Sequence, residues 1–597
     1  MSDIQSTVCI DGRDIVVDGR KIQILSGAVH YFRSMPERWD AICRKARAMG
    51  LNTIETYIPW NLHEPRPEKY DFSGIADLEK FIKCVQQAGL YLIVRCGPYI
   101  CAEWDNGGLP AWVTKQCCGS IRRDDPEYIR LVGRWFSKLL PLIAKYQHHL
   151  GGPVILAAVE NEYGSYGCDK EYLRKLRRMY LDAGITIPLV TADGGGDQQY
   201  VYGGMLPELP VTLTMGPDNC MKKFALLRTF RQDGPDFCME YWCGAFDHWG
   251  DPHRDVPDDK LFSEFEDMVS SGASVNLYMF HGGTNFGFFS GANSFYGGTG
   301  KDGVLYAPDI TSYDYNAPLS EAGNTTARYR ALRNIIEKYH PGTTEKEPPD
   351  FPSRAYPEVC FTACAPLFSH LGEIGTKHLS KHPLSMEDME LYRGFALYRT
   401  SVPGPCGNEF YCSATPWQLR DRAQLFFDGV FAADFSRNDG RKDVAVRIDK
   451  ESARLDLLVE NQGYVNFGPE NGQEHKGVKE ILLGGGCNHY LENFECYALP
   501  MDDLDKLVFE EMRELPENTP AFYRAEFDAA ETADTYIVFP GVKGFVVVNG
   551  FNIGRYWNIG PQQKLFVPGE LLKKGRNTII VFEQYKINRS IEFSDKP

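Results

Sequence analysis

The 597-residue chain has no hydrophobic run long enough to cross a membrane. A membrane-spanning helix needs about 18 to 20 consecutive apolar residues, and no stretch comes near that length. Long blocks of positive charge are also missing. The longest is RKLRR at 174–178, on a pattern typical of a solvated helix face, in a chain with a net charge of −16. Nucleic acids and membranes are therefore poor candidates for partners.

Paired cysteine motifs are missing as well. The 17 cysteines are odd in number, follow no regular spacing and include no CxxC pair, so structural zinc is not expected. The first residues, MSDIQSTVCIDGRDIVVDG, are partly acidic and lack the apolar core of a secretory signal. These features predict a cytoplasmic protein with unpaired thiols. The alternative is a secreted protein whose leader is absent from this sequence.

Short apolar runs and amphipathic helical patterns alternate over the first 340 residues. The candidate strands are 21–31, 52–60, 91–100, 154–164, 188–194, 211–216, 236–242 and 274–283. Several helical patterns between them end in glycine, as helix C-caps do. Eight β/α units predict an α/β fold, a (β/α)8 TIM barrel over residues 1–340. An open doubly wound sheet is the alternative, but no GxGxxG motif follows the first strand.

The sequence pattern changes after the predicted barrel. Residues 341–375, whose first part is rich in Pro, Gly and charge, are predicted to be a linker. Short alternating runs such as VAVRID and GFVVVNG then predict two all-β sandwich domains, of the galactose-binding-like or jelly-roll type, over 376–500 and 501–597. A weak internal repeat supports two related modules, because the segment from Gly429 to Glu460 resembles that from Gly550 to Glu583.

Carboxylates gather at the ends of the predicted barrel strands, where a TIM barrel has its active site. These strand ends carry Glu55, Glu103, Glu160, Glu162, Asp193 and Glu240. Without a Lys/Arg cluster for phosphate, such a rim favours a carbohydrate, whose hydroxyl groups need acceptors. Glycoside hydrolysis uses two carboxyl groups, one protonated and one ionised, and Glu162 and Glu240 are the natural pair.

A metal site is the alternative use of these carboxylates. His30, His63 and His281 would be the partners, but they are not spaced as HxH or HExxH. We therefore predict no metal and no other cofactor, since the two-carboxylate mechanism needs none.

Longer motifs resemble glycoside hydrolase family 35, whose members are mostly β-galactosidases. The matching stretches are ILSGAVHYFR, ETYIPWNLHEP, VRCGPYICAEWDNGGLPAW, VENEYGSYG, GGTNFG, TSYDYNAPLSEAG and VNGFNIGRYWNIGPQ. They occur in the family's order and span nearly the whole chain. The resemblance implies a TIM barrel followed by β domains, and hydrolysis of terminal β-galactosyl residues with retention of configuration.

The resemblance also implies residue roles. Glu162 would be the acid/base and Glu240 the nucleophile, while Asn161 would contact the sugar 2-hydroxyl. Glu160 is then expected to be structural. The other implied galactose contacts are Tyr57, Ile100, Ala102, Glu103, Tyr278 and Tyr315. Repulsion from the charge of Glu240 is expected to raise the pKa of Glu162, which has to hold a proton near neutral pH.

One departure from the family pattern concerns the substrate. After the nucleophile the chain has Trp242, and Ala245 stands where lysosomal-type members have an aromatic residue. Bacterial-type members more often carry a tryptophan at the position of Trp242. We expect Trp242 to shape the site of the leaving-group sugar and to favour β-1,3-linked galactosides. The alternative is a wall residue that only packs.

Two other functions stay open at this point. One is a different retaining β-glycosidase of the same barrel clan, and the other is a non-catalytic carbohydrate-binding protein on an inactive barrel. The expected partners are β-galactoside oligosaccharides. The β modules either bind sugar or are structural, for instance by presenting the loop ENQGYVNFG to the active site. The sequence leaves the oligomeric state open, with a homodimer as one option.

Overall fold

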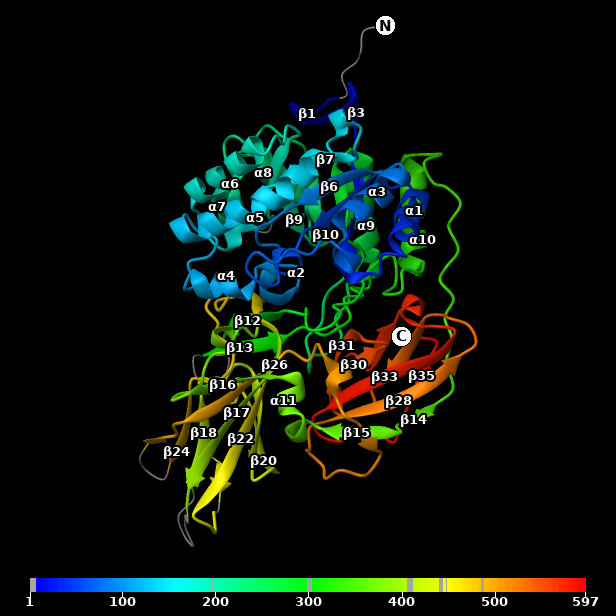
Figure 1. Cartoon of the computed structure of the whole chain (residues 1–597). Helices are drawn as coiled ribbons and strands as arrows, with labels where there is room; N and C mark the ends of the chain where they lie inside the picture. The colour runs from blue at the N-terminus through cyan, green and yellow to red at the C-terminus, as the bar shows by residue number, and fades with distance from the viewer. Residues whose placement is uncertain are drawn as a thin grey trace.

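A closed barrel of eight parallel strands forms the N-terminal half of the chain in the computed structural model (Figure 1). The structure describes residues 7–195, 197–297, 303–404, 412–439, 444–446, 448–484 and 488–597. The barrel strands are β4 (Leu25–Val29), β5 (Thr53–Tyr57), β6 (Tyr91–Arg95), β7 (Val154–Ala158), β8 (Leu189–Gly194), β9 (Val211–Met215), β10 (Phe237–Trp242) and β11 (Ser274–His281). Each lies within or closely overlaps a predicted run, so the predicted TIM barrel is confirmed.

One helix that follows each strand covers the outside of the barrel. These helices are α1 (Trp39–Met49), α3 (Leu78–Gln87), α5 (Pro126–Ala144), α6 (Lys170–Asp182), α7 (Gln198–Gly204), α8 (Cys220–Arg228), α9 (Asp258–Ser271) and α10 (Ala327–Tyr339). The short helices α2 (Trp60–His63) and α4 (Ala111–Gln116) lie in the loops after β5 and β6. The start of α5 illustrates the local signals: Asp125 caps it by accepting from two backbone amides, and Pro126 occupies the first turn.

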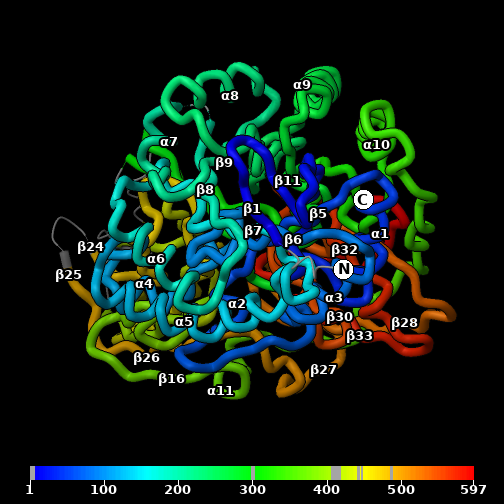
Figure 2. Tube along the Cα trace, turned by 90° about the horizontal axis from the view of Figure 1, so that it is seen from above, coloured from blue at the N-terminus to red at the C-terminus, as the bar shows by residue number. Residues whose placement is uncertain are grey.

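A small N-terminal sheet closes the far end of the barrel. It consists of β1 (Val8–Asp11), β2 (Asp14–Val17) and β3 (Arg20–Ile22). Ile15 packs there against barrel residues such as Ile93 and Ile155. In Figure 2 this sheet lies across the ring of barrel strands. The C-terminal ends of the strands therefore face the opposite way, toward the two β units below the barrel in Figure 1.

The first β unit is a sandwich of two sheets. Its six-stranded sheet contains β16 (Thr376–Ser380), β26 (Phe494–Leu499), β17 (Gly394–Pro403), β22 (Ser452–Asn461), β19 (Arg422–Phe427) and β20 (Val430–Ser436). The second sheet contains β21 (Val444–Val446), β18 (Cys412–Trp417), β24 (Glu480–Gly484) and β25 (Asn488–Tyr490). Apolar residues of both sheets, such as Leu457 and Leu483, form one core.

The second β unit is also a sandwich. Its six-stranded sheet contains β27 (Glu510–Glu511), β15 (Ala363–Pro366), β28 (Ala521–Ala529), β33 (Gly575–Glu583), β30 (Lys543–Val548) and β31 (Phe551–Trp557), and its small sheet contains β32 (Lys564–Val567), β29 (Thr535–Val538) and β35 (Phe593–Ser594). The two large sheets also pack on each other, through phenylalanines that include Phe395, Phe426, Phe545 and Phe582. The predicted all-β sandwich domains are therefore present.

The weak internal repeat corresponds to matching strands. The order β17-β22-β19-β20 in one unit equals β28-β33-β30-β31 in the other. Both hairpins turn at a left-handed residue followed by glycine, Asp428-Gly429 and Asn549-Gly550, as type I′ turns require. A bulge follows Leu425 in one hairpin and Val546 in the other. The two units therefore share this four-strand arrangement.

The segment 341–375 is more than a linker. It contains β14 (Val359–Cys360), β15 and α11 (Leu371–Ile374). The strand β15 pairs with β28 and so belongs to the sheet of the second β unit, although the first unit lies between them in sequence. The prediction of a linker is wrong for this strand, because its pairing partner lies more than 150 residues further along the chain. The other proposed domain limits stay predictions.

Two further expectations concern membranes and cysteines. Within the described ranges, no helix combines the length and the hydropathy that crossing a bilayer requires. Fourteen cysteines are free thiols in the structure, and many of them, such as Cys43 and Cys238, are buried.

Candidate active site

A cavity of about 320 Å³ opens at the C-terminal ends of the barrel strands. Nine of the predicted site residues line it: Tyr57, Ala102, Glu103, Asn161, Glu162, Glu240, Trp242, Tyr278 and Tyr315. They come from six different strand ends or loops, which the barrel brings together. Ile100 does not line the cavity. Its side chain is fully buried and packs beside Gly108.

Glu240, near the end of β10, accepts three hydrogen bonds. Tyr57 donates to Oε1 at 2.5 Å, Arg95 donates to the same oxygen, and the indole of Trp242 donates to Oε2 at 3.1 Å. A carboxylate has only acceptors, so three donors, one of them a guanidinium, suit the ionised form. They also fix the orientation of the carboxylate, which is 5 % exposed.

Arg95, the last residue of β6, links the two sides of the site. Its guanidinium donates to Glu240 and to the side-chain oxygen of Asn161. Since that oxygen is engaged, the NH2 group of Asn161 is the part left to donate to a ligand. Behind Arg95 lies Glu55, with 3.8 Å between Arg95 Nε and Glu55 Oε1. Glu55 is fully buried, and burial raises its pKa to about 8.

The turn after β7 separates the three polar residues that end this strand. Glu160 and Glu162 both have left-handed backbone conformations, with φ of 64° and 45°. Glu160 points away from the cavity to Arg122, with contacts of 2.9 and 2.7 Å, and accepts from Tyr172. Arg122 also donates to the backbone oxygen of Asn161 at 2.7 Å. This buried ion pair thus holds the turn, the structural role expected for Glu160.

Glu162 is partly exposed to the cavity and accepts a hydrogen bond from Thr214. Its pKa is raised to about 8, first by burial and second by the negative charge of Glu240. The predicted direction of the shift agrees with the structure, but repulsion from Glu240 is not its largest cause. At neutral pH the cavity therefore contains a protonated carboxyl group and, close to it, a carboxyl group that accepts three donors.

A third acidic side chain lies on the opposite loop. Tyr313 donates to Glu103, and burial raises the pKa of Glu103 to about 7. The hydroxyl groups of Tyr278 and Tyr313 are 3.3 Å apart, and the rings of Tyr278 and Tyr315 meet edge-on at 5.6 Å. These groups form a wall of hydroxyl, carboxyl and aromatic surfaces, the mixture that a sugar ring needs.

Not all of the strand-end carboxylates face the cavity. Glu55 lies behind Arg95, and Asp193 accepts from the backbone amide of Gly164 at 3.1 Å, outside the lining. The three histidines considered as metal ligands are dispersed. His63 contacts Tyr31 at 2.6 Å, His281 contacts the backbone of Glu321, and His30 contacts Arg33. No group of three metal-ligating side chains occurs within the described ranges.

The sequence interpretation did not include several residues of the site. Arg95 is the most important of them, and its signal was visible: an arginine at the end of the apolar run YLIV needs a buried partner. Cys101, Phe246, Asn293 and Phe467 also line the cavity. Phe467 belongs to the loop ENQGYVNFG of the first β unit, so this unit reaches the site. Presenting this loop to the site was one of the two roles considered for the β modules.

A three-stranded sheet brings this loop to the barrel. The hairpin of β12 (Ala292–Tyr296) and β13 (Val304–Pro308), which follows β11, pairs with β23 (Val465–Phe467). In Figure 1 this sheet lies between the barrel and the first β unit. The hydroxyl group of Tyr99 donates to the backbone oxygen of Asn466 in addition. The first β unit thus completes one wall of the cavity.

Comparison with known proteins agrees with this geometry. Residues 14–339 match the family described as "Glycosyl hydrolases family 35", residues 383–500 match "Beta-galactosidase, first all-beta domain" and residues 520–577 match "Beta-galactosidase, galactose-binding domain". The chain is 38% identical to the beta-galactosidase of Bos taurus over 99% of this chain and 94% of that protein.

Two further relatives are similar over comparable lengths. The beta-galactosidase-1-like protein of Mus musculus is 38% identical over 98% of this chain and 90% of its own length. The beta-galactosidase of Homo sapiens is 38% identical over 95% of this chain and 85% of its own length. With the closed barrel, the β units and the cavity described above, these matches establish that the chain belongs to glycosyl hydrolase family 35 and is a glycoside hydrolase.

Proposed function

We propose that this enzyme is a retaining exo-β-galactosidase, with Glu162 as acid/base and Glu240 as nucleophile. The observation that carries the proposal is the pairing of two differently held carboxyl groups in one cavity. Glu240 accepts from Arg95, Tyr57 and Trp242, whereas the pKa of Glu162 is raised to about 8. Retaining hydrolysis needs this division between an ionised and a protonated carboxyl group.

The two steps follow from these positions. In the first, a Glu240 oxygen attacks the anomeric carbon, the glycosidic bond breaks, and Glu162 gives its proton to the leaving oxygen. Glu240 is then an uncharged ester, so its repulsion of a charge on Glu162 disappears and ionised Glu162 becomes acceptable. In the second step Glu162 takes a proton from water as the water oxygen attacks the anomeric carbon and the ester bond to Glu240 breaks. The β-sugar then leaves, with Glu162 protonated and Glu240 again a carboxylate.

Substrate size and linkage are the finer part of the proposal. The cavity volume of about 320 Å³ lies near the lower end of small-molecule sites, roughly 300–1,000 Å³, which suits one terminal sugar rather than the middle of a chain. Trp242 lies at the same cavity and also donates to Glu240. We propose that its ring forms part of the site for the leaving-group sugar and favours β-1,3-linked galactosides.

The first test is hydrolysis of nitrophenyl β-galactoside, with the released anomer followed by NMR. Wild-type enzyme should release β-galactose first, and Glu240→Gln should lose activity by orders of magnitude because the nucleophile is gone. Nitrophenyl β-glucoside and β-glucosaminide provide the comparison. Initial release of α-galactose would contradict retention, and faster cleavage of another sugar would contradict the assignment to galactosides.

Glu162 needs a separate variant. Glu162→Gln cannot give a proton, so it should hardly cleave disaccharides but should still form the glycosyl-enzyme from dinitrophenyl galactoside, whose leaving group needs no acid. Equal losses on both substrates would contradict the acid/base role. For linkage, Trp242→Ala should lower activity on a β-1,3 disaccharide more than on its β-1,4 isomer. Equal losses on the two isomers would contradict the linkage proposal.

A further inference from the structure

Two larger cavities adjoin the catalytic cavity and share lining residues with it. The first, of about 690 Å³, lies between the barrel and the second β unit and shares Ala245, Phe246 and Tyr315. The second, of about 370 Å³, shares Phe467. We call the second the Tyr296 groove, formed by Arg123, Ser165, Tyr166, Tyr296, Phe467 and Asn471 among others. Each is a possible path for a substrate that extends beyond the catalytic cavity.

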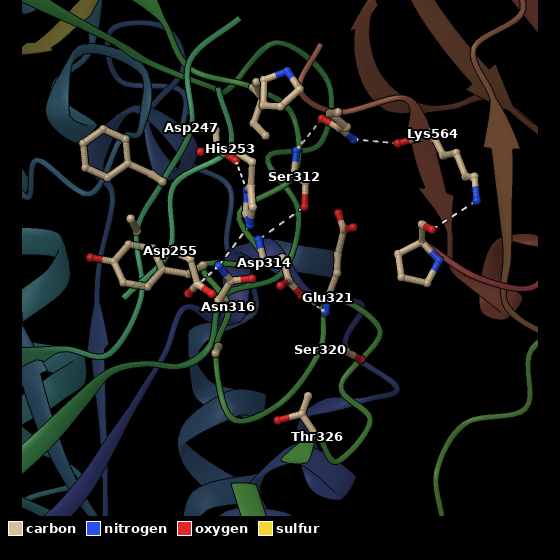
Figure 3. A pocket seen from close by; sticks show the side chains of 18 of the residues that line it. Asp247, His253, Asp255, Ser312, Asp314, Asn316, Ser320, Glu321, Thr326 and Lys564 are labelled. Atoms are coloured by element: carbon tan, nitrogen blue, oxygen red, sulfur yellow. Dashed lines mark hydrogen bonds and ion pairs between the residues drawn. The ribbon is translucent and has the colours of Figure 1, made fainter. Parts of the chain in front are cut away.

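The polar groups of the larger cavity are already engaged with one another (Figure 3). His253 contacts Asp247 at 2.7 Å, and Asp255 pairs with Arg328 at 2.7 Å. From the second β unit, Lys564 donates to Ser594 and to the backbone oxygen of the C-terminal residue. The backbone amide of Ser312 also donates to the side-chain oxygen of Gln562 at 3.0 Å, which joins the barrel to the second β unit. These contacts leave little capacity for the hydroxyl groups of a ligand.

The Tyr296 groove has the opposite character. The side chain of Tyr296 is 82% exposed and that of Phe467 44%, and neither ring packs against another ring of the described residues. Arg123 is exposed and makes no hydrogen bond or ion pair with any residue that the structure describes. Asn471 uses its NH2 group on two backbone oxygens, and its side-chain oxygen has no protein partner. Aromatic faces and unused hydrogen-bonding groups are thus combined.

The position of the groove indicates which part of a substrate would reach it. The leaving-group oxygen has to lie beside the acid, Glu162, so the leaving group extends from the cavity on that side. Ser165 and Tyr166 follow Glu162 in the chain and line the groove, and Ser165 donates to the backbone oxygen of Glu162 at 2.7 Å. Phe467 lines both spaces. The groove therefore continues the catalytic cavity in the direction of the leaving group.

We propose that the Tyr296 groove binds the second sugar ring of the leaving group, so that the enzyme prefers galactose-terminated trisaccharides to disaccharides. The inference rests on the proposed β-galactosidase function. The ring of Tyr296 offers a flat apolar face for one side of a sugar ring, while the exposed Arg123 offers donors for its hydroxyl groups. Ligand sites combine apolar walls with a few polar groups in this way.

The test compares three substrates: nitrophenyl β-galactoside, a galactosyl disaccharide, and the trisaccharide that extends this disaccharide by one ring at its reducing end. One stacking contact changes affinity by about threefold to tenfold, and we expect the wild-type kcat/KM to rise by that factor from disaccharide to trisaccharide. Tyr296→Ala should abolish the rise through a higher KM for the trisaccharide. Tyr296→Phe, which keeps the ring, should preserve it, and Arg123→Ala should reduce it.

Tyr490→Ala is the matched control, because Tyr490 is also an exposed tyrosine, 53% accessible, on β25 of the first β unit. This control should keep the trisaccharide advantage, and all variants should cleave nitrophenyl galactoside at the wild-type rate. Equal wild-type kcat/KM for the two saccharides, or an advantage that survives Tyr296→Ala, would overturn the inference. Failure of the wild type to cleave nitrophenyl galactoside would instead overturn the proposed function on which the inference rests.

Discussion

Glu55 is a buried carboxyl group that the structure leaves without a hydrogen-bond partner for either oxygen. It is 0 % exposed, and burial raises its pKa from 4.5 to about 8, against the opposing effect of Arg95. We predict that Glu55→Gln stabilises the enzyme at pH 7. The amide is uncharged at every pH and has nearly the same shape, and the unpartnered side-chain oxygen of Asn276 is available as an acceptor.

The magnitude follows from proton linkage. Folded protein holds the proton of Glu55 up to about pH 8, whereas unfolded chain loses it above 4.5. The stability that this proton contributes is therefore complete below pH 4.5 and is lost as the pH rises toward 8. At about 1.4 kcal/mol per pH unit, the loss is about 3 kcal/mol at pH 7 and below 1 kcal/mol at pH 5. Glu55→Gln removes this pH-dependent loss.

Melting temperatures of wild type and Glu55→Gln at pH 5 and pH 7 test the prediction. The advantage of the variant should grow between the two pH values by about 2 kcal/mol, which is roughly 4 °C for a domain of this size. Glu531→Gln is the control, since the side chain of Glu531 is 71% exposed and its replacement should have the same small effect at both values. A difference between wild type and Glu55→Gln that is equal at pH 5 and pH 7 would refute the reasoning.

Three further predictions concern residues around the two carboxyl groups proposed to be catalytic. Because the pKa of Glu162 is about 8, the first step should slow as the pH rises through that value, and a pH profile of kcat/KM should lack this limb in Glu162→Gln. Arg122→Met leaves the charge of Glu160 buried without a partner, which should cost about 3–5 kcal/mol of unfolding free energy by urea titration. Adding Glu160→Gln should recover part of it, and no recovery would contradict the ion pair. Trp242→Phe keeps a ring but loses the donor to Glu240, so kcat should fall about fivefold, and an unchanged kcat would make that hydrogen bond irrelevant.

The barrel could be predicted because its signals are local. Buried strands such as VILAA are apolar throughout, and the polar residues after them mark the catalytic rim. Helix α10 has a weaker local signal than these strands. Only Tyr329, Leu332 and Ile336 of its 13 residues are buried, so its apolar stripe is narrow and follows a long polar loop. A helix with so few buried residues gives a weak periodic signal.

Contacts between distant segments could not be predicted in this way. The strand β15 looks like part of a linker because nothing near it in sequence pairs with it, and β23 is held at the barrel by its pairing with β12, which follows β11. This pairing helps to place Phe467 at the cavity. The proposed catalytic pair came from the resemblance to a known family, and the loop ENQGYVNFG was one option for the cavity wall, whereas the pairing that holds this loop at the barrel required the structure.

Backbone conformation is the other part of the site that residue types do not reveal. Cys101, Ala102 and Glu103 are three consecutive residues with φ of 56°, 60° and 48°, and none is a glycine. Each such residue costs of order 1 kcal/mol or more, so surrounding contacts have to hold them. Arg33 donates to the backbone oxygen of Ala102, and the amide of Gly291 donates to that of Glu103 at 3.0 Å.

The loop that carries Glu103 is also held directly by the first β unit. The amide of Tyr464 donates to Asp105 at 2.9 Å, and Tyr99 donates to the backbone of Asn466. Both links join the loop that carries Glu103 to the loop that supplies Phe467. The β unit therefore has two roles at the site, because the same segment that closes the cavity wall also stabilises a strained loop on the barrel. A barrel sequence alone would predict the rim carboxylates but not the conformation in which Glu103 faces the cavity.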